Sequence, residues 1–323
     1  MKTALLRMIL LLGAGMSSAH AQQAMPVTLP LEVVSGHLVI TLDDQKLGSL
    51  RLMVDTGATQ TLMGLRAVQG VPVDRHLTDR FFRFNGFGSG SKAKLKGHAV
   101  LQLGSGGHDL GKIDALVLNR AQIDSGLQPE VDGILGWDFF AGRCVRIDSK
   151  GKQMVVGPAA GCAPTGSGFY SPPVDWTKDG LLLPVTLTLT SGRQLRLNLH
   201  VDTGSDSIVL SPRLRDDLQM SSLPQASVNK GSGVNGSFVW DRVLATKIEA
   251  DGGHPHMEGT IPLTVMRKGS YSQPHWFTDG PILARLLRDG SLGNNMLGYF
   301  ELIFDGGQKK LYERAYSLGE KKQ

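Results

Sequence analysis

Apolar and polar residues alternate along most of the chain, a pattern that predicts β-strands. The pattern is clearest in residues 31–63 and 181–210, where strands joined by a turn end in Val-Asp-Thr-Gly in both stretches. The two halves also close alike, because residues 132–156 and 293–312 each carry apolar residues and a glycine, then aromatic residues, a strand, a charged turn and a last strand. This repeated order predicts an all-β chain built from two copies of one unit.

The two copies define the expected domains. The first lobe takes residues 22–156 and the second lobe residues 181–323, and a connector rich in Pro, Gly and Ser, residues 157–180, joins them. The closing glycine follows the aspartate of Asp-Thr-Gly by 81 positions in the first copy and by 96 in the second, so the second copy carries an insertion of about 15 residues within 252–292. This insertion either shapes one end of a cleft or decorates the surface.

The composition supports a folded protein. Of 323 residues, 41% are hydrophobic and 20% are charged, which is enough apolar material for a core and excludes a disordered or collagen-like chain. Glycine is frequent, with 41 residues, which suggests many tight turns or mobile glycine loops. The formal net charge of +5 is mild and scattered, so we expect no nucleic-acid partner.

Residues 1–21 are typical of a secretory signal peptide. Lys2 and Arg7 give a basic start, Met8–Leu12 forms an apolar stretch, and Ala19-His20-Ala21 fits a cleavage site for small residues. Cleavage after Ala21 removes two positive charges and leaves +3. An uncleaved membrane anchor is the alternative, but the apolar stretch is shorter than the ~20 residues that span a bilayer. We expect a periplasmic or secreted protein with no stable membrane insertion after cleavage.

The chain has two cysteines, Cys144 and Cys162, which stand 18 positions apart. In an oxidising compartment such a pair can close a disulfide, and two buried free thiols are the alternative. His254, His256 and His275 lie near one another in the sequence, but the proline between the first two and their polar surroundings indicate a surface loop. We therefore expect a disulfide and no metal.

Each half carries a glycine-rich stretch about 30 residues after its Asp-Thr-Gly motif, Gly86–Ser91 in the first half and Gly231–Gly236 in the second. Alternating sequence follows each stretch, as a glycine-tipped β-hairpin requires. The second stretch also matches the dinucleotide fingerprint, which has to open a helix, whereas Phe238-Val239-Trp240 predicts a strand. We expect two hairpins and no nucleotide cofactor, with ordinary surface turns as the alternative.

Asp55 and Asp202 are the candidate reactive groups, because each ends an apolar strand and begins Asp-Thr-Gly. If a pseudo-twofold axis relates the halves, the two carboxyl groups meet at that axis. Two carboxyl groups a few ångströms apart do not both ionise readily, and they share one proton. The ionised group can then take a proton from water while the protonated group polarises a scissile carbonyl.

Over about residues 30–315, these motifs make the chain similar to aspartic peptidases, and in particular to bacterial retropepsin-type proteins that carry two fused copies of the fold. The resemblance implies two lobes of the acid-protease type with a cleft between them, and Asp55 and Asp202 as the catalytic pair. It also implies threonines that hydrogen-bond across the axis and glycines whose backbone faces the carboxylates. These supporting positions are Thr56, Thr203, Gly57 and Gly204.

The same resemblance assigns segments that pack behind the site and cover it. Ile134-Leu135-Gly136 and Met296-Leu297-Gly298 resemble the apolar segments that thread behind each active-site loop. The two hairpins resemble flaps, and Phe87 stands where pepsin-like flaps have tyrosine, so the hydrogen bond of that phenol is lost. The flap or substrate-binding residues are Gly86, Phe87, Gly88, Gly231 and Gly233.

The residue after each motif differs, Ala58 in the first copy and Ser205 in the second. A hydroxyl at this position can donate to the nearby carboxylate and favour its charged form. We therefore hypothesise that Ser205 supports the site, that Asp202 tends to carry the charge and that Asp55 tends to carry the proton, within a pair that titrates as a unit.

The expected function is that of an aspartic endopeptidase, which hydrolyses peptide bonds with a water activated by the Asp55/Asp202 pair and needs no cofactor. Its substrate is a peptide or protein in extended conformation, bound as an added strand, and we expect a monomer. The alternative is a non-cleaving peptide-binding or scaffold protein of the cell envelope with the same fold. A third alternative is a narrow processing enzyme that cuts one envelope partner.

Overall fold

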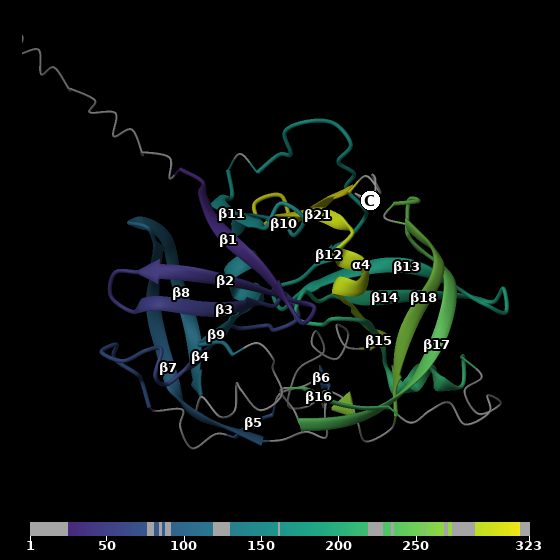
Figure 1. Cartoon of the computed structure of the whole chain (residues 1–323), viewed down its shortest axis with the longest axis horizontal. Coiled ribbons are helices and arrows are strands. Elements are labelled where there is room, and N and C mark those ends of the chain that lie inside the picture. The colour runs from purple at the N-terminus through teal and green to yellow at the C-terminus, as the bar shows by residue number, and fades with distance from the viewer. Residues whose placement is uncertain are drawn as a thin grey trace, which may run out of the picture.

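The computed structural model is almost entirely β-structure, with the strands of the two halves on either side of the molecule (Figure 1). The predicted signal peptide, residues 1–21, lies outside the described residues. The structure describes residues 25–75, 81–83, 86–87, 92–118, 130–160, 162–218, 229–233, 236–254, 256–267, 271–272 and 288–316.

The first half forms strands where its sequence alternates. In β1 (Val27–Val34), for example, Val27, Leu29 and Leu31 are buried and the residues between them are exposed. A single helical turn, α2 (Trp137–Phe140), follows the last short strand. The other strands are β2 (His37–Asp44), β3 (Gly48–Val54), β4 (Leu62–Gly64), β5 (Phe81–Arg83), β6 (Gly86–Phe87), β7 (Lys92–Ser105), β8 (His108–Leu118) and β9 (Gly133–Leu135).

The second half repeats this succession. A helical turn, α4 (Asn294–Leu297), again follows a short strand, and a 3-10 turn, η1, takes Pro212–Arg215. The strands are β12 (Asp175–Trp176), β13 (Leu181–Leu189), β14 (Gln194–Val201), β15 (Ile208–Leu210), β16 (Asn229–Gly233), β17 (Gly236–Ala250), β18 (His256–Met266), β19 (Tyr271–Ser272) and β20 (Gly290–Leu292).

The two halves share one strand order. Neighbouring strands run β2-β3-β9-β4-β8-β7-β5 in the first half and β13-β14-β20-β15-β18-β17-β16 in the second. The strand directions also agree between the halves, because β3–β9 and β14–β20 are parallel pairs, as are β4–β8 and β15–β18. The chain therefore has the predicted all-β architecture of two similar lobes related by a pseudo-twofold axis.

Four strands near the ends of the two halves form a sheet that both halves share (Figure 1). They are β10 (Arg143–Asp148), β11 (Gln153–Pro158), β21 (Phe300–Asp305) and β22 (Lys310–Ala315). β21 pairs with β10 and β11 pairs with β1, so the last strands of the chain join the sheet of the first half. The connector leads away from the end of β11 and returns through β12, which pairs with β13.

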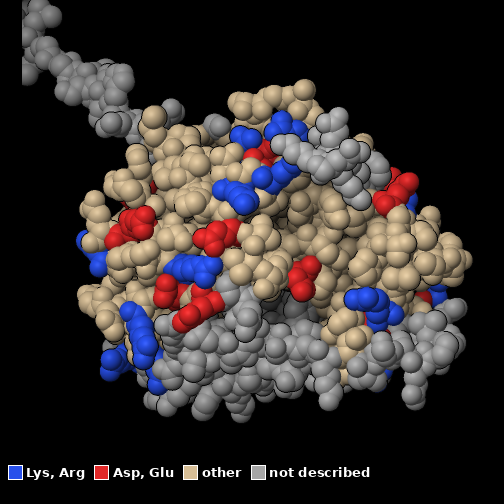
Figure 2. Space-filling view, in the orientation of Figure 1, with Lys and Arg blue, Asp and Glu red and all other residues tan. Residues whose placement is uncertain are grey.

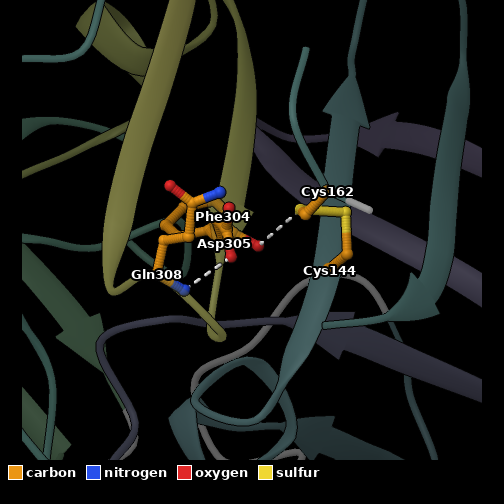
Figure 3. The surroundings of a disulfide bond; sticks show 5 residues. All are labelled: Cys144, Cys162, Phe304, Asp305 and Gln308. Atoms are coloured by element: carbon orange, nitrogen blue, oxygen red, sulfur yellow. Dashed lines mark hydrogen bonds between the residues drawn. A yellow bond between two sulfur atoms is a disulfide. The ribbon is translucent and has the colours of Figure 1, made fainter. Parts of the chain in front are cut away.

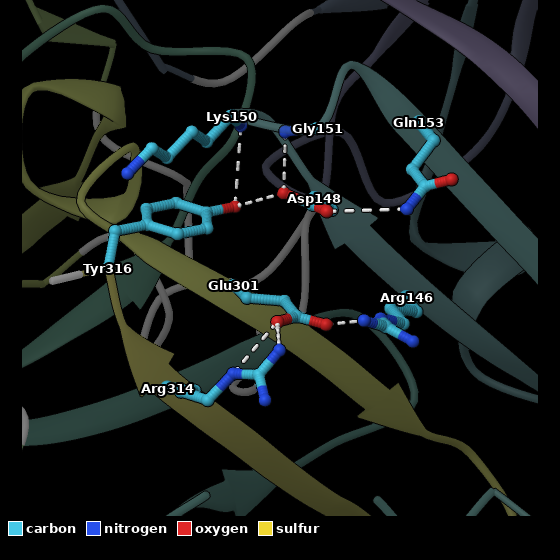
Figure 4. A network of polar contacts seen from close by, with 8 residues as sticks. All are labelled: Arg146, Asp148, Lys150, Gly151, Gln153, Glu301, Arg314 and Tyr316. Carbon is cyan, nitrogen blue, oxygen red and sulfur yellow. Dashed lines mark hydrogen bonds and ion pairs between the residues drawn. The ribbon is translucent and has the colours of Figure 1, made fainter. Parts of the chain in front are cut away.

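A buried carboxylate anchors this shared sheet (Figure 4). Glu301 of β21 is 1% exposed and forms ion pairs with Arg146 of β10 and Arg314 of β22. Beside it, the Tyr316 hydroxyl donates to Asp148 Oδ1 over 2.9 Å. These contacts hold strands of both halves in one register, which fixes the lobes relative to each other.

The predicted disulfide between Cys144 and Cys162 is present, and it lies against β21 (Figure 3). Cys144 belongs to β10, and Cys162 Sγ lies 3.7 Å from the carbonyl oxygen of Phe304. The bond ties the start of the connector to the sheet that both halves share. It closes a loop with a sequence separation of 18.

Replacing both cysteines by alanine is expected to lower the free energy of unfolding by about 3 kcal/mol, because the unfolded chain loses the constraint of a closed loop. Chemical denaturation of the parent and the double variant measures the loss. Reduction of the parent with a thiol should produce the same shift and provides the control. Equal midpoints for the oxidised parent and the double variant would show that the bond contributes nothing.

Glu313 of β22 is a buried acid that bears no role in the predicted site. It is 4% exposed, its Oε1 has no hydrogen-bond partner in the described part of the chain, and burial raises its pKa from 4.5 to about 9. A carboxyl that is neutral in the fold but ionises in the unfolded chain stabilises the fold fully below pH 4.5. That contribution is lost as the pH rises toward 9.

We therefore expect Glu313→Gln to raise the free energy of unfolding at neutral pH, by on the order of 2 kcal/mol, and to flatten its decline toward alkaline pH. Glu258→Gln is the matched control, because the Glu258 side chain is 65% exposed. Urea unfolding at several pH values measures both variants. A decline of the same steepness in Glu313→Gln and the parent would contradict this assignment.

The surface carries mixed charge. Lys and Arg side chains are interspersed with Asp and Glu on the face shown in Figure 2, in agreement with a mild, scattered net charge. Among the residues that the structure describes, no helix has the length and apolar character needed to cross a membrane.

Candidate functional site

The two Asp-Thr-Gly loops meet where the lobes face each other, and their threonines lock them together. Thr56 Oγ1 donates to the carbonyl of Val201 over 2.8 Å, and Thr203 Oγ1 donates to the carbonyl of Val54 over 2.9 Å. Each hydroxyl also accepts the backbone N–H of the opposite threonine, over 3.0 and 3.1 Å. Both threonines are 0% exposed, so this symmetric set of four bonds holds the loops without competition from water.

Glycine follows each threonine because the opposite aspartate occupies the space of a side chain. A Cβ at Gly57 would lie 2.3 Å from Asp202 Oδ1, and a Cβ at Gly204 would lie 2.2 Å from Asp55 Cγ. Each carboxyl group therefore rests on the backbone of the other loop. The structure thus brings Asp55 and Asp202 together, as the pattern of two motifs predicts.

Backbone amides favour the ionised form of Asp55. Its Oδ1 accepts the N–H groups of Gly57, over 2.8 Å, and of Ala58, over 3.0 Å. Burial raises the pKa of Asp55, and the two amides, a hydrogen bond from Asp202 and the electrostatic effect of His37 oppose that rise. Asp55 is therefore the member of the pair that loses its proton first.

Asp202 is set to hold the shared proton. Burial raises its pKa well above the ordinary value, and the negative charge of Asp55 raises it further. Among the described residues, its Oδ1 accepts one backbone N–H, that of Gly204, over 3.0 Å, and the side chain of Ser291 also lowers its pKa. The hypothesis that Asp202 carries the charge and Asp55 the proton is therefore wrong in direction.

That hypothesis depended on Ser205, and its hydroxyl points elsewhere. Ser205 Oγ donates to the carbonyl of Ser207 over 2.9 Å and accepts the N–H of Ser207 over 3.4 Å. The hydroxyl supports the turn after the second motif and not the carboxylate of Asp202. At Asp55, by contrast, the backbone amide of Ala58 supplies a second donor to the carboxylate. Because every residue except proline has such an amide, the identity of residue 58 does not predict this bond.

A short strand that is followed by a glycine passes behind each loop. In the first half this is β9, as predicted, and the carbonyl of Leu135 accepts the N–H of Asp55 over 3.0 Å. In the second half it is β20, and the carbonyl of Leu292 accepts the N–H of Asp202 over 3.0 Å. The assignment of this role to Met296-Leu297-Gly298 is therefore wrong.

The segment that takes this role is Ser291-Leu292-Gly293. A Cβ at Gly293 would lie 2.2 Å from the carbonyl oxygen of Ser207, so glycine is needed for the close passage. Met296 and Leu297 lie instead in α4, and Gly298 caps it. Ser291 is polar and stands where the apolar-apolar-Gly pattern requires an apolar residue, so the pattern does not identify this segment. Counted to Gly293, the second copy is 10 positions longer than the first.

The first half contributes a further contact to the second loop. The β1–β2 hairpin turns through Ser35 and Gly36, which have φ of 51° and 83°, as a tight two-residue turn requires. The Asn294 side chain donates to the carbonyl of Gly36 over 2.9 Å and to that of Thr203 over 2.7 Å. Asn294 thus links both lobes to the second motif, and nothing in its sequence context marks it.

The predicted flaps are described in part. Gly231 and Gly233 lie in β16, which pairs with β17 as a hairpin, so a strand and not a helix follows this glycine stretch. Gly86 and Phe87 form β6, and Gly88 lies outside the described residues. β6 pairs with β19, which comes from the predicted insertion of the second half. The insertion therefore reaches the first predicted flap.

The histidines near the insertion form no metal site in the described part of the chain, where no group of three or more potential ligands occurs. The ring of His254 instead lies 5.1 Å from that of Tyr170. His275 lies outside the described residues.

Comparison with known proteins reveals the fold. No family model and no curated protein sequence matches the chain. Among solved structures, the aspartic proteinase from Irpex lacteus is 15% identical with a TM-score of 0.54, and the match covers 91% of this chain and 98% of that one. Basic 7S globulin from soybean is 12% identical with a TM-score of 0.52, covering 91% and 96%.

Conglutin gamma, a basic 7S globulin from lupine seeds, is 10% identical with a TM-score of 0.52, and covers 92% of this chain and 96% of its own. Proteins with this fold thus carry the names of both proteinases and seed globulins. At such identities the likeness concerns the fold alone. The chain has the two-lobed, pepsin-like fold that an aspartic proteinase also has.

Proposed function

We propose that this protein is an aspartic endopeptidase, which hydrolyses peptide bonds with a water held between Asp55 and Asp202. The observation that carries the proposal is that each carboxyl group rests on the glycine backbone of the opposite loop. Asp55, with two amide donors, takes a proton from the water. Asp202 holds the other proton and gives it to the scissile carbonyl oxygen as the water attacks.

The substrate that suits this site is an extended peptide. A peptide in extended conformation can bind along an exposed sheet edge through backbone hydrogen bonds, with its alternate side chains in pockets. The pairing of β6 with β19 gives one end of the predicted flap a backbone contact from the other half. We propose that the substrate peptide binds beside this strand pair. We also propose that the protein acts as a monomer and needs no cofactor.

We also propose that the protein works outside the cytoplasm. The Cys144–Cys162 disulfide supports this, because disulfides persist in oxidising compartments. The predicted signal peptide, residues 1–21, supports it from the sequence. Mass spectrometry of the protein recovered from its natural host tests it, since cleavage after Ala21 should give a mature chain that begins at Gln22.

A non-cleaving peptide-binding protein is the second candidate function. Two of the three similar structures named above are globulins by name, so the fold does not by itself imply cleavage. The intact pair of carboxyl groups weighs against this candidate, because binding an extended peptide needs no shared proton.

The deciding experiment is incubation with a diverse peptide library from about pH 3 to 8, analysed by mass spectrometry. The proposal predicts new peptide ends with the parent protein and none with Asp55→Asn or Asp202→Asn. Cleavage that persists in either variant would remove the pair from the mechanism. Peptides that are retained but not cut would favour the binding protein.

A further inference from the structure

One row of residues behind the two aspartates differs between the lobes. In the first half, Val39, Met53, Ile134 and Leu62 stand side by side on four neighbouring strands. All four are apolar and at most 5% exposed. All four belong to one small core cluster, and Ala58, the residue after the first motif, packs against this cluster.

In the second half the corresponding row is Leu182, His200, Ser291 and Val209. Its two middle members are polar, although each is 1% exposed. His200 and Ser291 therefore take the places that Met53 and Ile134 hold in the first half. Two buried polar residues cost stability unless they have partners, so this exchange calls for an explanation.

The polar pair lies next to Asp202. His200 precedes Asp202 by two positions, and alternate residues of a strand face the same side. A Cβ at Gly180 would lie 2.4 Å from His200 Nε2, so the imidazole fills the space that Gly180 leaves open.

Both polar groups have hydrogen-bonding capacity to spare. His200 Nε2 and Ser291 Oγ are buried, and neither makes a hydrogen bond of normal geometry in the described part of the chain. The Ser291 side chain nevertheless lies close enough to Asp202 to lower the pKa of that carboxyl group through a hydrogen bond. Burial lowers the pKa of His200 to about 4, so above that pH the ring is neutral. A neutral imidazole offers one nitrogen as an acceptor, and a serine hydroxyl has one proton to donate.

We propose that Ser291 and His200 are positioning residues that form a hydroxyl relay for Asp202. While Asp202 holds the shared proton, the Ser291 hydroxyl donates to His200 Nε2. When Asp202 passes that proton to the scissile carbonyl oxygen and becomes charged, the hydroxyl turns and donates to the carboxylate. The relay stabilises a charge that develops during the reaction, and such interactions raise kcat more than they affect binding.

The relay rests on the proposed peptidase function and explains why the lobes differ. Asp55 is charged before the reaction and is held by two backbone amides. Asp202 becomes charged only during the reaction, and one amide serves it among the described residues. The charge of Asp55 therefore needs no further donor from Met53 and Ile134 behind it. The charge that develops on Asp202 is stabilised by a hydroxyl donor that can turn toward it.

Kinetics of substituted proteins test the relay. Ser291→Ala is expected to lower kcat about 10- to 100-fold with little change in KM, because a hydrogen bond to a charged group is lost. It should also move the alkaline limb of the pH–rate profile to higher pH, since ionised Asp202 loses its donor. Ser291→Thr keeps a hydroxyl, so its kcat and the position of its alkaline limb should stay close to those of the parent.

His200→Met separates the relay from a structural role. Without the competing acceptor, Ser291 can donate to Asp202 permanently, so the alkaline limb should move to lower pH, opposite to Ser291→Ala. The ionisable groups that bear on this titration are Asp55 across the axis and His37, which acts electrostatically on Asp55. Limbs that move in the same direction, or not at all, in the two variants would overturn the relay.

A measurement without substrate keeps failure of the relay distinct from failure of the peptidase function. If the parent cleaves no peptide, the ¹⁵N signal of His200 Nε2 is recorded by NMR in the full-length protein. The relay predicts that Ser291→Ala shifts this signal and that Ser291→Thr does not. A signal that is unaffected by Ser291→Ala would show that the hydroxyl does not donate to the imidazole.

Discussion

Replacing Asp55 by asparagine is expected to lower kcat for peptide cleavage about 10²- to 10⁴-fold, the range that a general base contributes. Asparagine keeps the size of the side chain but cannot take a proton from water. Asp202→Asn should produce a loss of the same order, because the amide cannot give a proton to the carbonyl oxygen. Steady-state assays with a peptide selected from the library measure both.

The matched control is Asp206→Asn, which removes an exposed carboxylate from the same loop as Asp202. Its rate should stay close to that of the parent. If Asp206→Asn and Asp55→Asn lost activity to the same extent, the effect would reflect disturbance of the loops and not loss of a base. Circular dichroism of each variant confirms that it has folded.

Replacing Thr203 by valine is expected to lower the free energy of unfolding by about 2–6 kcal/mol, since two buried groups lose their partners at about 1–3 kcal/mol each. The carbonyl of Val54 loses its donor, and the N–H of Thr56 loses its acceptor. Valine preserves the shape of the side chain, so the loss reports the hydrogen bonds. Urea denaturation measures it.

Thr203→Ser provides the control, because serine keeps the hydroxyl and should retain most of the stability. Thr56→Val should cost a similar amount, since Thr56 makes the symmetric pair of bonds. If either valine variant unfolded at the same urea concentration as the parent, the bonds between the loops would contribute little to holding the lobes together.

The repeated motif made the fold and the meeting of Asp55 and Asp202 predictable from the sequence. Two strands that end in the same tripeptide imply a symmetric pair, and symmetry places both aspartates at one axis. The close approach of Gly57 and Gly204 to the opposite carboxyl groups agrees with this expectation. Local alternation also predicted strands, because one face of each strand is buried.

Finer assignments failed where a side chain had a choice of partners. The Ser205 hydroxyl can reach a carboxylate or a backbone carbonyl, and it donates to the carbonyl of Ser207. Residue type does not decide between the two. The proton of the aspartate pair was misplaced for the same reason, because backbone amides of Gly57 and Ala58 determine it.

Contacts between the halves were also hidden. β21 pairs with β10 across more than 150 positions of sequence, and alternation within β21 does not indicate its partner. Ser291 was missed because a polar residue broke the expected apolar pattern at the place where β20 passes behind the second loop. Such exchanges become visible only when corresponding positions of the two lobes are compared.

The central claim is that Asp55 and Asp202 share one proton and together activate a water. The pH dependence of kcat/KM for a cleaved peptide tests it most directly, because this quantity reports the ionising groups of the free enzyme. We predict a bell-shaped profile whose acid limb marks loss of the first proton from the pair and whose alkaline limb marks loss of the second. A profile without an acid or without an alkaline limb, or one that keeps both limbs in Asp55→Asn, would contradict the claim.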